Sequence, residues 1–383
     1  MRHLFFAPFL MIPTACTGAP VPDDQPATTS GDSDFPFAME TLATYDEPWA
    51  ADFMPGTDVL FVTGKKGALH WIDVTDGREG QISEGLPEVD YGGQGGFGDI
   101  AFSPTAAVEN PPIVYLTWVE AGVDDMRGAV LGRGNILCEG DDQCQLANLE
   151  VIWRQVKTQG RGHYSHRIAF SPDGQYLFLT SGDRQKKSPA QDFDSNLGKV
   201  LRLTLDGEPA PDNPWADRGG RAAEFWSMGH RNLLGIEFAP DGRLWQIEMG
   251  PKDGDELNLI ERGGNYGWPE VSMGVEYSGM PIADHSEGDG FIAPVAWWVP
   301  AISPGSFLIY DGDLFEGWKG DALLAGLSGK TIAHVDLEDG EAVSKTRYNM
   351  DNRMREIVEG RDGALYALED KSGARLIRLT PKD

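Results

Sequence analysis

Hydrophobic residues in this chain fall into short runs that are joined by tight polar turns. The runs pair up, as in IAFSPDGQYLFLTSGD, IEFAPDGRLWQIEMG and IVEGRDGALYALED, and DVLFVTGKKGALHWIDV and DALLAGLSGKTIAHVDL follow the same plan. Pro-Asp-Gly and Lys-Gly are turn sequences typical of β-hairpins. Amphipathic helical patterns are scarce, whereas Gly (48) and Pro (25) are abundant. The pattern therefore predicts many short antiparallel strands.

The strand–turn–strand unit recurs about six times between Ala38 and the C-terminus, and it persists to the end of the chain. Four-stranded antiparallel units that cannot bury both faces alone pack radially into a propeller. We therefore predict an all-β fold: one six-bladed β-propeller of four-stranded antiparallel blades over residues 38–383. A β-sandwich with extra hairpins is the alternative, and the persistence of the repeat disfavours it.

The N-terminal residues MRHLFFAPFLMIPTAC have a positive start, an apolar stretch and small residues at the end. This arrangement predicts a secretory signal peptide over residues 1–16 and a periplasmic or secreted protein. Cys16 follows Pro13-Thr14-Ala15, which loosely resembles a lipoprotein processing site, so a lipid anchor on Cys16 is an alternative. Residues 17–37 are rich in Pro, Thr, Ser and Asp and are predicted to form a disordered linker.

Charge and cysteine content restrict the partners and the covalent chemistry. Asp and Glu (60) exceed Lys and Arg (32), for a net charge of −28. Such a surface repels nucleic acid and anionic lipid, so neither is expected as a partner. Cys138 and Cys144 bracket the short segment EGDDQ. In an exported protein this spacing predicts a local disulfide, and no second Cys or His pair lies nearby to complete a metal site.

Two segments that precede predicted strands carry candidate catalytic groups. GGQGGFG contains a formal G-x-G-x-x-G, but a strand follows it and not a helix, so we expect a sharp backbone turn with the Gln94 amide facing either a ligand or solvent. In RGHYSHR, His163 and His166 would point to opposite faces of extended backbone, which makes them a poor chelating pair. One of them is either a general base facing the propeller axis or an ordinary core or surface histidine.

The segment from Glu224 to Trp268 concentrates further polar groups around two predicted strands, Leu234 to Phe238 and Leu244 to Glu248. A cation and an amide precede the first strand, and a carbonyl- and carboxylate-rich turn follows the second; these are Arg231, Asn232, Gly250, Pro251, Asp253, Asp255 and Glu256. Oxygen-rich loops suit a hard metal ion, so a ligand and metal site is one interpretation and a solvated hairpin is the other.

Arg353 and Arg355 lie two residues apart, which places both guanidinium groups on one face of a strand. Two such groups repel each other unless an anion lies between them, so the pair indicates an anionic ligand. In a propeller the strand ends of different blades converge on one mouth. Together, the candidate residues predict a pocket for a planar polyanion and a hard cation.

Six motifs resemble those of the soluble quinoprotein glucose dehydrogenases and aldose sugar dehydrogenases, in order from about Ala38 to the C-terminus: GGQGGFGDIAFSP, GHYSHRIAFSPDG, LGKVLRLTLDGEPAPDNPW, WSMGHRNLLGIEFAPDGRLW, EMGPKDGDELNLIERGGNYGWP and DNRMREIVEGRDGALYAL. That family is a six-bladed propeller that binds pyrroloquinoline quinone (PQQ) and Ca²⁺. It oxidises the C1 hydroxyl of an aldose to a lactone by hydride transfer to PQQ. The resemblance implies the same reaction here, with electrons passed to an external quinone or cytochrome-like acceptor.

The resemblance also implies roles for individual residues. His163 matches the catalytic base, and Arg231 matches the residue that polarises the C5 carbonyl of the cofactor. The remaining matches are cofactor contacts at Asn232, Arg353 and Arg355, substrate contacts at Gln94 and Asp255, and calcium ligation by the main-chain oxygens of Gly250 and Pro251.

Three positions depart from the family pattern. Gly162 replaces an aspartate, and Ser328 replaces a lysine that Lys330 is a candidate to substitute. Val299 replaces a tryptophan, which leaves Trp298 and its neighbour Trp297 as candidates for stacking on the substrate. Cofactor binding is expected, whereas activity on glucose itself does not follow. The rival functions are a calcium-dependent propeller lactonase and a non-catalytic propeller that binds a carbohydrate or a protein.

Overall fold

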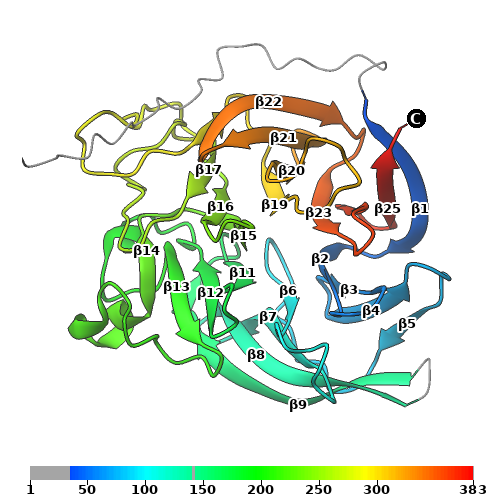
Figure 1. Cartoon of the computed structure of the whole chain (residues 1–383). Coiled ribbons are helices and arrows are strands. Elements are labelled where there is room, and N and C mark those ends of the chain that lie inside the picture. Colours follow the sequence, from blue (N-terminus) through cyan, green and yellow to red (C-terminus); the bar gives the residue numbers. More distant parts are fainter. Residues whose placement is uncertain (1–34, 140–142, 383) are drawn as a thin grey trace, which may run out of the picture.

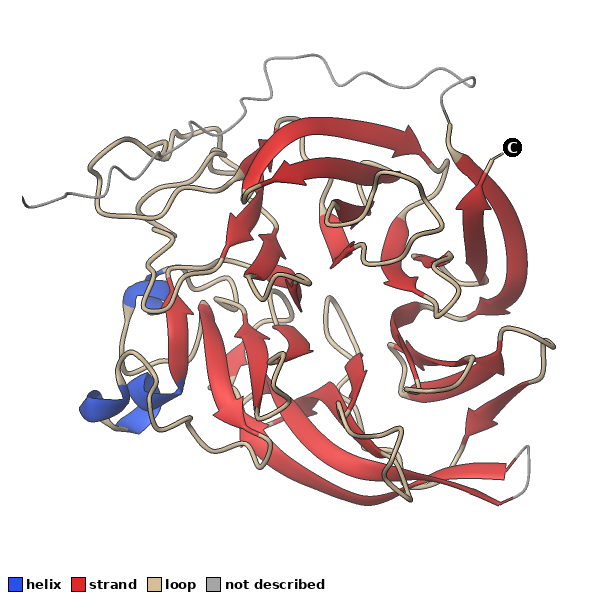
Figure 2. Cartoon of the chain, in the orientation of Figure 1, coloured by secondary structure: helices blue, strands red, loops and turns tan. Residues whose placement is uncertain are grey.

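The computed structural model describes residues 35–139 and 143–382, and it is built almost entirely of strands. Six antiparallel sheets surround a central axis in the order of the sequence (Figure 1). Three short 3-10 helices, η1 (Ser188–Gln191), η2 (Ala216–Arg218) and η3 (Gly220–Glu224), are the helices among the described residues, and they lie at the rim of one blade (Figure 2). The predicted six-bladed propeller is confirmed.

Each blade is named here by its strands from the axis outward, with bounds given in chain order. The first blade comprises β2 (Pro48–Phe53), β3 (Val59–Gly64), β4 (Ala68–Asp73) and β5 (Glu79–Ile82). The second comprises β6 (Phe97–Phe102), β7 (Ile113–Ala121) and β8 (Met126–Glu139), with β9 (Gln143–Arg154) and β10 (Thr158–Gln159) both paired to β8. The third comprises β11 (Ser165–Phe170), β12 (Tyr176–Ser181), β13 (Lys199–Thr204) and β14 (Phe225–Met228).

The fourth blade comprises β15 (Leu233–Phe238), β16 (Leu244–Glu248), β17 (Asp255–Leu259) and β18 (Ala296–Trp298). The fifth comprises β19 (Pro304–Ile309), β20 (Ala322–Gly326), β21 (Thr331–Glu338) and β22 (Glu341–Asn349). The sixth comprises β23 (Met354–Glu359), β24 (Leu365–Glu369) and β25 (Ala374–Pro381), and its outermost strand is β1 (Phe37–Tyr45).

The two ends of the described chain close the ring. β1 pairs antiparallel with β25, from Phe37 opposite Pro381 to Tyr45 opposite Ala374 (Figure 1). Phe37 is only 3% exposed and packs edge-on against Phe35, so the prediction of a disordered linker is wrong at its C-terminal end. The physical reason is that the apolar residues of FPF complete the sixth blade. The predicted signal peptide, Cys16 and residues 17–34 lie outside the described residues.

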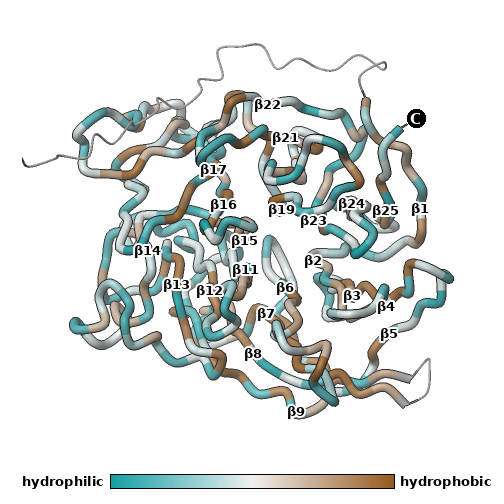
Figure 3. The backbone as a smooth tube through the Cα atoms, viewed as in Figure 1, coloured by the Kyte–Doolittle hydropathy of each residue, from teal (hydrophilic) through white to brown (hydrophobic). Residues whose placement is uncertain are grey.

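The hydrophobic core is divided among the seams between blades. Each of the six seams contains its own cluster of buried apolar side chains; for example, Trp49 and Phe97 belong to the seam between the first two blades, and Trp245 and Phe307 to the seam between the fourth and fifth. Apolar strand segments alternate with polar turns along the tube in Figure 3. Because both faces of every blade are covered by its neighbours, the repeated unit is stable only in a closed ring.

Arg167 of β11 lies across the axis and contacts all five other innermost strands. Its guanidinium group pairs with Asp99 of β6 (2.8 Å) and with Glu356 of β23. It also donates to the carbonyl oxygens of Leu234 in β15 (3.0 Å) and Gly305 in β19 (2.7 Å), and it lies 4.1 Å from the Trp49 ring of β2. On one side of Arg167, the C-terminal ends of the innermost strands surround a space on the axis. Several Asp and Glu side chains line this space.

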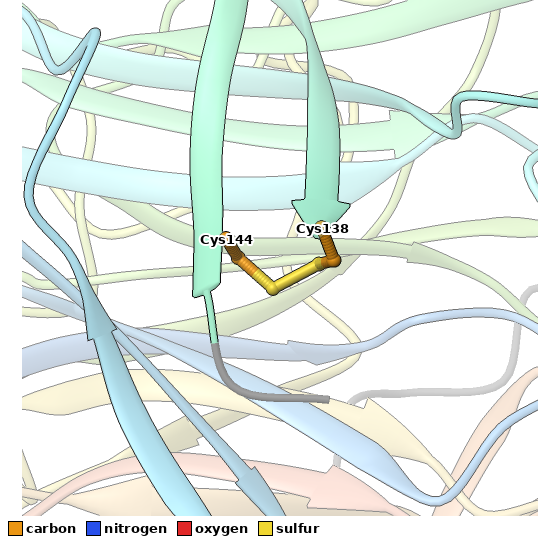
Figure 4. The surroundings of a disulfide bond; sticks show 2 residues. All are labelled: Cys138 and Cys144. Atoms are coloured by element: carbon orange, nitrogen blue, oxygen red, sulfur yellow. A yellow bond between two sulfur atoms is a disulfide. The ribbon is translucent and has the colours of Figure 1, made fainter. Parts of the chain in front are cut away.

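The second blade carries the predicted disulfide. Cys138 and Cys144 face each other across the β8–β9 hairpin, with their Cα atoms 4.0 Å apart, and their sulfur atoms are bonded (Figure 4). The prediction of a local disulfide is confirmed. Within residues 35–139 and 143–382 the structure contains no helix with the length and apolar character that crossing a membrane requires.

Candidate active site

One mouth of the axial channel contains a cavity of about 340 Å³, which we call the axial cavity. It is bounded by the segments at which innermost strands begin and by the turns that follow several second strands. The lining residues used below are Trp49, Lys65, Gly93, Gln94, Asn232, Ser303, Arg353, Arg355 and Asp370. With Ser165 and His166 of the third blade also among the lining residues, all six blades contribute polar groups to one space, as the sequence predicted for a propeller mouth.

His163 lies beside this cavity in the loop that enters β11, and it is 5% exposed. Its Nδ1 atom is 2.7 Å from Oδ1 of Asp183, whose Oδ2 accepts a hydrogen bond from Trp268 Nε1 at 2.9 Å. Burial lowers the pKa of His163, and the positive charge of Arg231 lowers it further, while Asp183 acts in the opposite direction. The arrangement favours a neutral imidazole with its proton on Nδ1 and its Nε2 lone pair available.

His166, the other histidine of this segment, is buried in the wall of the axial cavity. Its ring stacks on Trp49 with a centroid distance of 5.0 Å, and its Nδ1 lies 2.8 Å from Thr117 Oγ1. Burial lowers the pKa of His166 to about 3. The two histidines thus have different surroundings, as predicted, but extended backbone is not the cause, because His163 and His166 have positive φ angles of 48° and 63°.

Gln94 and the glycines around it position His163. The side-chain oxygen of Gln94 accepts a hydrogen bond from the His163 backbone N–H at 2.6 Å, and the Gln94 backbone N–H donates to the Arg161 carbonyl at 2.8 Å. Gly93 has a φ of 60°, and a Cβ atom there would lie 2.6 Å from the Arg161 carbonyl oxygen. This close approach requires glycine. The G-x-G-x-x-G is therefore a turn that leads into β6, as predicted.

Arg184 fixes the loop that carries His163, and the sequence analysis did not identify it. It is 1% exposed, and it donates hydrogen bonds to the carbonyl oxygens of Gly162 (2.9 Å), Gly160 (2.6 Å) and Arg127 (2.9 Å). Its guanidinium carbon lies 3.8 Å from the centre of the Tyr164 ring. Burial lowers the pKa of Arg184 to about 10, so the group is still charged at neutral pH.

Arg231 and Asn232 lie immediately before β15, where the sequence placed them. The Nη1 atom of Arg231 donates to the carbonyl oxygens of Met249 (2.8 Å) and Gly250 (2.6 Å). Its Nε atom is buried and has no hydrogen-bond partner within the described residues. Asn232 is 1% exposed, and its side-chain oxygen accepts from Ser165 Oγ at 3.3 Å. A buried guanidinium donor without a partner indicates that an acceptor is missing from the site.

A buried carboxylate beneath Arg231 fixes its backbone. Glu248 Oε2 accepts the Arg231 N–H at 2.6 Å, while Oε1 accepts from Asn258 Nδ2 at 3.3 Å. Oε1 also lies 3.2 Å from His230 Nδ1. Above Arg231, the exposed Tyr277 accepts a hydrogen bond from Nη2 at 3.3 Å through its hydroxyl. Tyr277 comes from the long β17–β18 connection, and no periodic signal in the sequence points to it.

The predicted calcium turn follows β16, but Asp255 has a different place from the one the resemblance implied. Its carboxylate is 2% exposed and accepts backbone N–H groups from Gly250 (3.0 Å), Ile302 (2.8 Å) and Ser303 (2.6 Å). Burial raises its pKa to about 6. Because both oxygens are engaged with the backbone, Asp255 fixes the Gly250-Pro251 turn against the β18–β19 loop, and it is not among the residues that line the axial cavity. Among the described residues, no three His, Cys, Asp or Glu side chains come together as a metal site.

Arg353 and Arg355 both line the axial cavity, as their spacing predicted, but the carboxylate between them belongs to the chain itself. Arg353 Nε donates to Asp370 Oδ2 at 2.8 Å, and Arg355 donates to Oδ1 through Nε (3.0 Å) and Nη2 (2.8 Å). Asp370 follows β24, and the arginines precede and begin β23. Their ion pairs with Asp370 lower its pKa even though burial opposes the change. The pair alone therefore does not require an external anion.

The three departures from the family pattern have clear structural consequences. The space beside Gly162 is filled by the Gln185 side chain, which a Cβ atom at Gly162 would meet at 2.6 Å. Ser328 lies 2.6 Å from Ser303 through the two hydroxyl oxygens, and Lys330 is exposed in the β20–β21 turn, outside the residues that line the cavity. Trp298 is fully buried in the seam between the fourth and fifth blades, so the prediction that it stacks on substrate is wrong.

Sequence analysis missed Asp183, the partner of His163, and Asp370, the partner of the two arginines, because both come from turns that only the fold brings to the site. Asp183 follows the predicted strand LFLTS in the same repeat as His163. A carboxylate at that strand end was a usable signal. Asp370 occupies the corresponding place after β24, in the repeat of the two arginines.

Comparison with known proteins agrees with this geometry. Residues 45–378 match the Glucose / Sorbosone dehydrogenase family. The aldose sugar dehydrogenase YliI of Escherichia coli (strain K12) is 32% identical over 346 residues, which cover 88% of this chain and 91% of that protein.

Two solved structures show the same fold along almost their whole length. The soluble aldose sugar dehydrogenase of Escherichia coli in its apo-form superposes with a TM-score of 0.84 at 31% identity, covering 90% of this chain and 100% of that one. The PQQ-bound form of the aldose sugar dehydrogenase of Streptomyces coelicolor gives a TM-score of 0.74 at 27% identity, covering 91% and 99%. Since the family match reaches into all six blades, the chain belongs to the Glucose / Sorbosone dehydrogenase family.

Proposed function

We propose that this protein is an exported quinoprotein that oxidises the C1 hydroxyl of an aldose to a lactone, using PQQ and Ca²⁺, and passes the electrons to an external acceptor. The observation that carries the proposal is the buried His163–Asp183 pair together with Arg231, whose Nε donor lacks an acceptor. His163 and Arg231 directly precede Tyr164 and Asn232, which line the axial cavity. Family membership and the PQQ-bound structural relative support the same reaction class.

The residues of the cavity fit PQQ, a planar tricarboxylate. Arg353 and Arg355 supply charged donors at one wall, and Arg231, which directly precedes the lining residue Asn232, supplies a buried one. The volume of about 340 Å³ lies within the range of small-molecule sites, which is roughly 300–1,000 Å³. When bound, PQQ supplies the two-electron acceptor that amino-acid side chains lack.

His163 acts in this proposal as the general base. Its Nδ1–H donates to Asp183, so Nε2 accepts the proton of the sugar hydroxyl as the C1–H bond is broken. The lowered pKa of His163 keeps the imidazole neutral at the pH of the periplasm or the medium. The Gln94 contact and the Arg184 contacts fix the backbone of this loop, so the base does not have to be ordered by the substrate.

Calcium would be bound by the main-chain oxygens of Gly250 and Pro251. Ca²⁺ prefers roughly six to eight oxygen ligands, and these two carbonyl oxygens supply only a small part of that number. Since the described residues offer no acidic metal site, the remaining ligands would come from PQQ and water. We therefore expect Ca²⁺ and PQQ to bind interdependently.

Reconstitution of the purified protein tests the proposal. We expect stoichiometric, Ca²⁺-dependent PQQ binding, followed by absorbance, and dye reduction driven by a panel of aldoses. His163→Ala should bind PQQ and fail to turn over. Normal rates in that variant would rule out His163 as the base. Failure of the wild type to bind PQQ would overturn the proposal, and Ca²⁺-dependent lactone hydrolysis without PQQ would establish the lactonase alternative instead.

A further inference from the structure

A third cation, Lys65, lines the axial cavity together with Arg353 and Arg355. It follows β3 in the first blade, and its side chain is half-buried. The ammonium group donates to the carbonyl oxygen of Gly93 at 3.1 Å, in the glycine turn that also carries Gln94. Lys65 thus reaches the cavity from a different blade than the arginine pair.

No carboxylate within the described residues forms an ion pair with Lys65. The acidic groups whose charges act on Lys65 are Glu47 and Asp370, and each is engaged elsewhere. Glu47 accepts a hydrogen bond from the Tyr91 hydroxyl at 2.7 Å and pairs with Lys66 at 3.5 Å. Asp370 accepts from both arginines.

The environment of Lys65 disfavours its charge in the absence of a ligand. Burial lowers its pKa, and Arg355 and Arg353 lower it further, while Glu47 and Asp370 only partly compensate. Three cations and one carboxylate line the cavity, so the wall carries two uncompensated positive charges. An anionic ligand would relieve this repulsion and gain charge-assisted hydrogen bonds.

We propose that Lys65 is the third cation of the cofactor clamp and binds a carboxylate of the polyanion that Arg353 and Arg355 also bind. This inference rests on the proposed function. Other members of the family have a lysine at the position of Ser328, and in this chain the inference gives the role of that lysine to Lys65. Ser328 is engaged with Ser303, and Lys330 lies outside the cavity, so the fifth blade supplies no cation to this wall.

Lys66 provides a matched control, because it is the next residue and has the opposite environment. It is exposed and pairs with Asp46 at 2.6 Å. Lys66 is not among the residues that line the cavity, so removal of its charge leaves the lining in place while altering the net charge of the protein by the same amount.

The experiment is an equilibrium titration of PQQ, followed by its absorbance or by protein fluorescence, into the apo-protein with saturating Ca²⁺. Lys65→Gln should raise Kd by about 10- to 100-fold, the range for one charge-assisted hydrogen bond in a partly buried site. Lys66→Gln should change Kd by less than about twofold. Lys65→Arg should bind more tightly than Lys65→Gln, because it restores the charge.

The thermal midpoint of each apo-protein shows whether the fold is intact. We expect the midpoint of apo Lys65→Gln to equal or exceed that of the wild type, because the repulsion from both arginines is removed, and the midpoint gain on adding PQQ to be smaller. If the wild type binds PQQ and Lys65→Gln binds it equally well, the inference about Lys65 is wrong. If the wild type does not bind PQQ, the proposed function itself is wrong.

Discussion

The link between Asp183 and His163 gives the sharpest test of the proposed chemistry. Asp183 is completely buried, and its carboxylate accepts from His163 Nδ1 at 2.7 Å, Trp268 Nε1 at 2.9 Å and the Gln185 backbone N–H at 2.8 Å. Asp183→Asn keeps the size of the side chain and one acceptor oxygen. It removes the charge that orients the imidazole and stabilises its protonated form during proton transfer.

We expect Asp183→Asn to lower kcat by about 10²- to 10⁴-fold, or about 3–5 kcal/mol of transition-state stabilisation. The pH profile should move as well. Asp183 raises the pKa of His163 against the lowering by burial, so its removal lowers that pKa further. A base must be deprotonated to act, and the acid limb of kcat/KM reports its pKa in the free enzyme. The limb should therefore shift to lower pH in Asp183→Asn.

The assay is steady-state dye reduction by the PQQ-loaded protein between about pH 4 and 9, with kcat and KM fitted separately. Asp194→Asn, an exposed carboxylate in the same connection, is the control and should resemble the wild type. An unchanged kcat in Asp183→Asn would refute the dyad. A lower kcat with an unmoved acid limb would show that Asp183 acts only on the shape of the loop.

Three further predictions concern the scaffold. Arg167→Leu leaves buried carboxylates unpaired at the axis, so it should lower the free energy of unfolding, measured by urea titration, by about 3–5 kcal/mol. The control Arg154→Leu removes a half-exposed ion pair and should change the free energy of unfolding by less than about 1 kcal/mol. Burial raises the pKa of Glu237 to about 8, so its contribution to stability is fully present below the unfolded-state pKa and is lost as pH rises through 8. Glu237→Gln should therefore reduce the loss of stability between pH 6 and 9, and an equal loss in both proteins would contradict the assignment. Replacing Cys138 and Cys144 by Ser opens a loop with a sequence separation of 6 and should cost about 2 kcal/mol, and an unchanged urea midpoint would show that the hairpin needs no crosslink.

The fold could be predicted because its signal is local and repeated. Each hairpin is recognisable from a turn sequence between two apolar runs. The predicted strand Leu244 to Glu248 has the same bounds as β16. The end of the linker was misjudged because Phe37 gains its structure from β25, more than 300 residues away, as the pairing of Phe37 with Pro381 shows. The composition of residues 17–37 gives no information about a pairing partner so far away in the sequence.

The sequence predicts a site residue correctly where its position before or after a strand is enough to place it at the cavity. His163 lies beside the cavity and Arg353 lines it because both lie just before innermost strands, β11 and β23. Trp298 and Asp255 have the right residue types and lie in the right segment, yet one packs in a seam and the other is consumed by backbone N–H groups. Whether a tryptophan or a carboxylate faces a cavity depends on strand pairing across blades, and neighbouring residues do not specify it.

The contrast between the acidic chain and its cationic cavity bears on the proposal that this protein repels most polyanions and binds one small polyanion. Charges on the rim and outer surface act across solvent and are screened beyond about 8 Å at physiological ionic strength. Lys65, Arg353 and Arg355 act at contact distance in a partly desolvated space, where the same charge interacts several times more strongly. A large polyanion such as nucleic acid meets the net charge of −28 and cannot enter a cavity of about 340 Å³. A small planar polyanion would reach the cations inside, so under the proposed function size exclusion and local charge together would select the class of ligand that the cavity accepts.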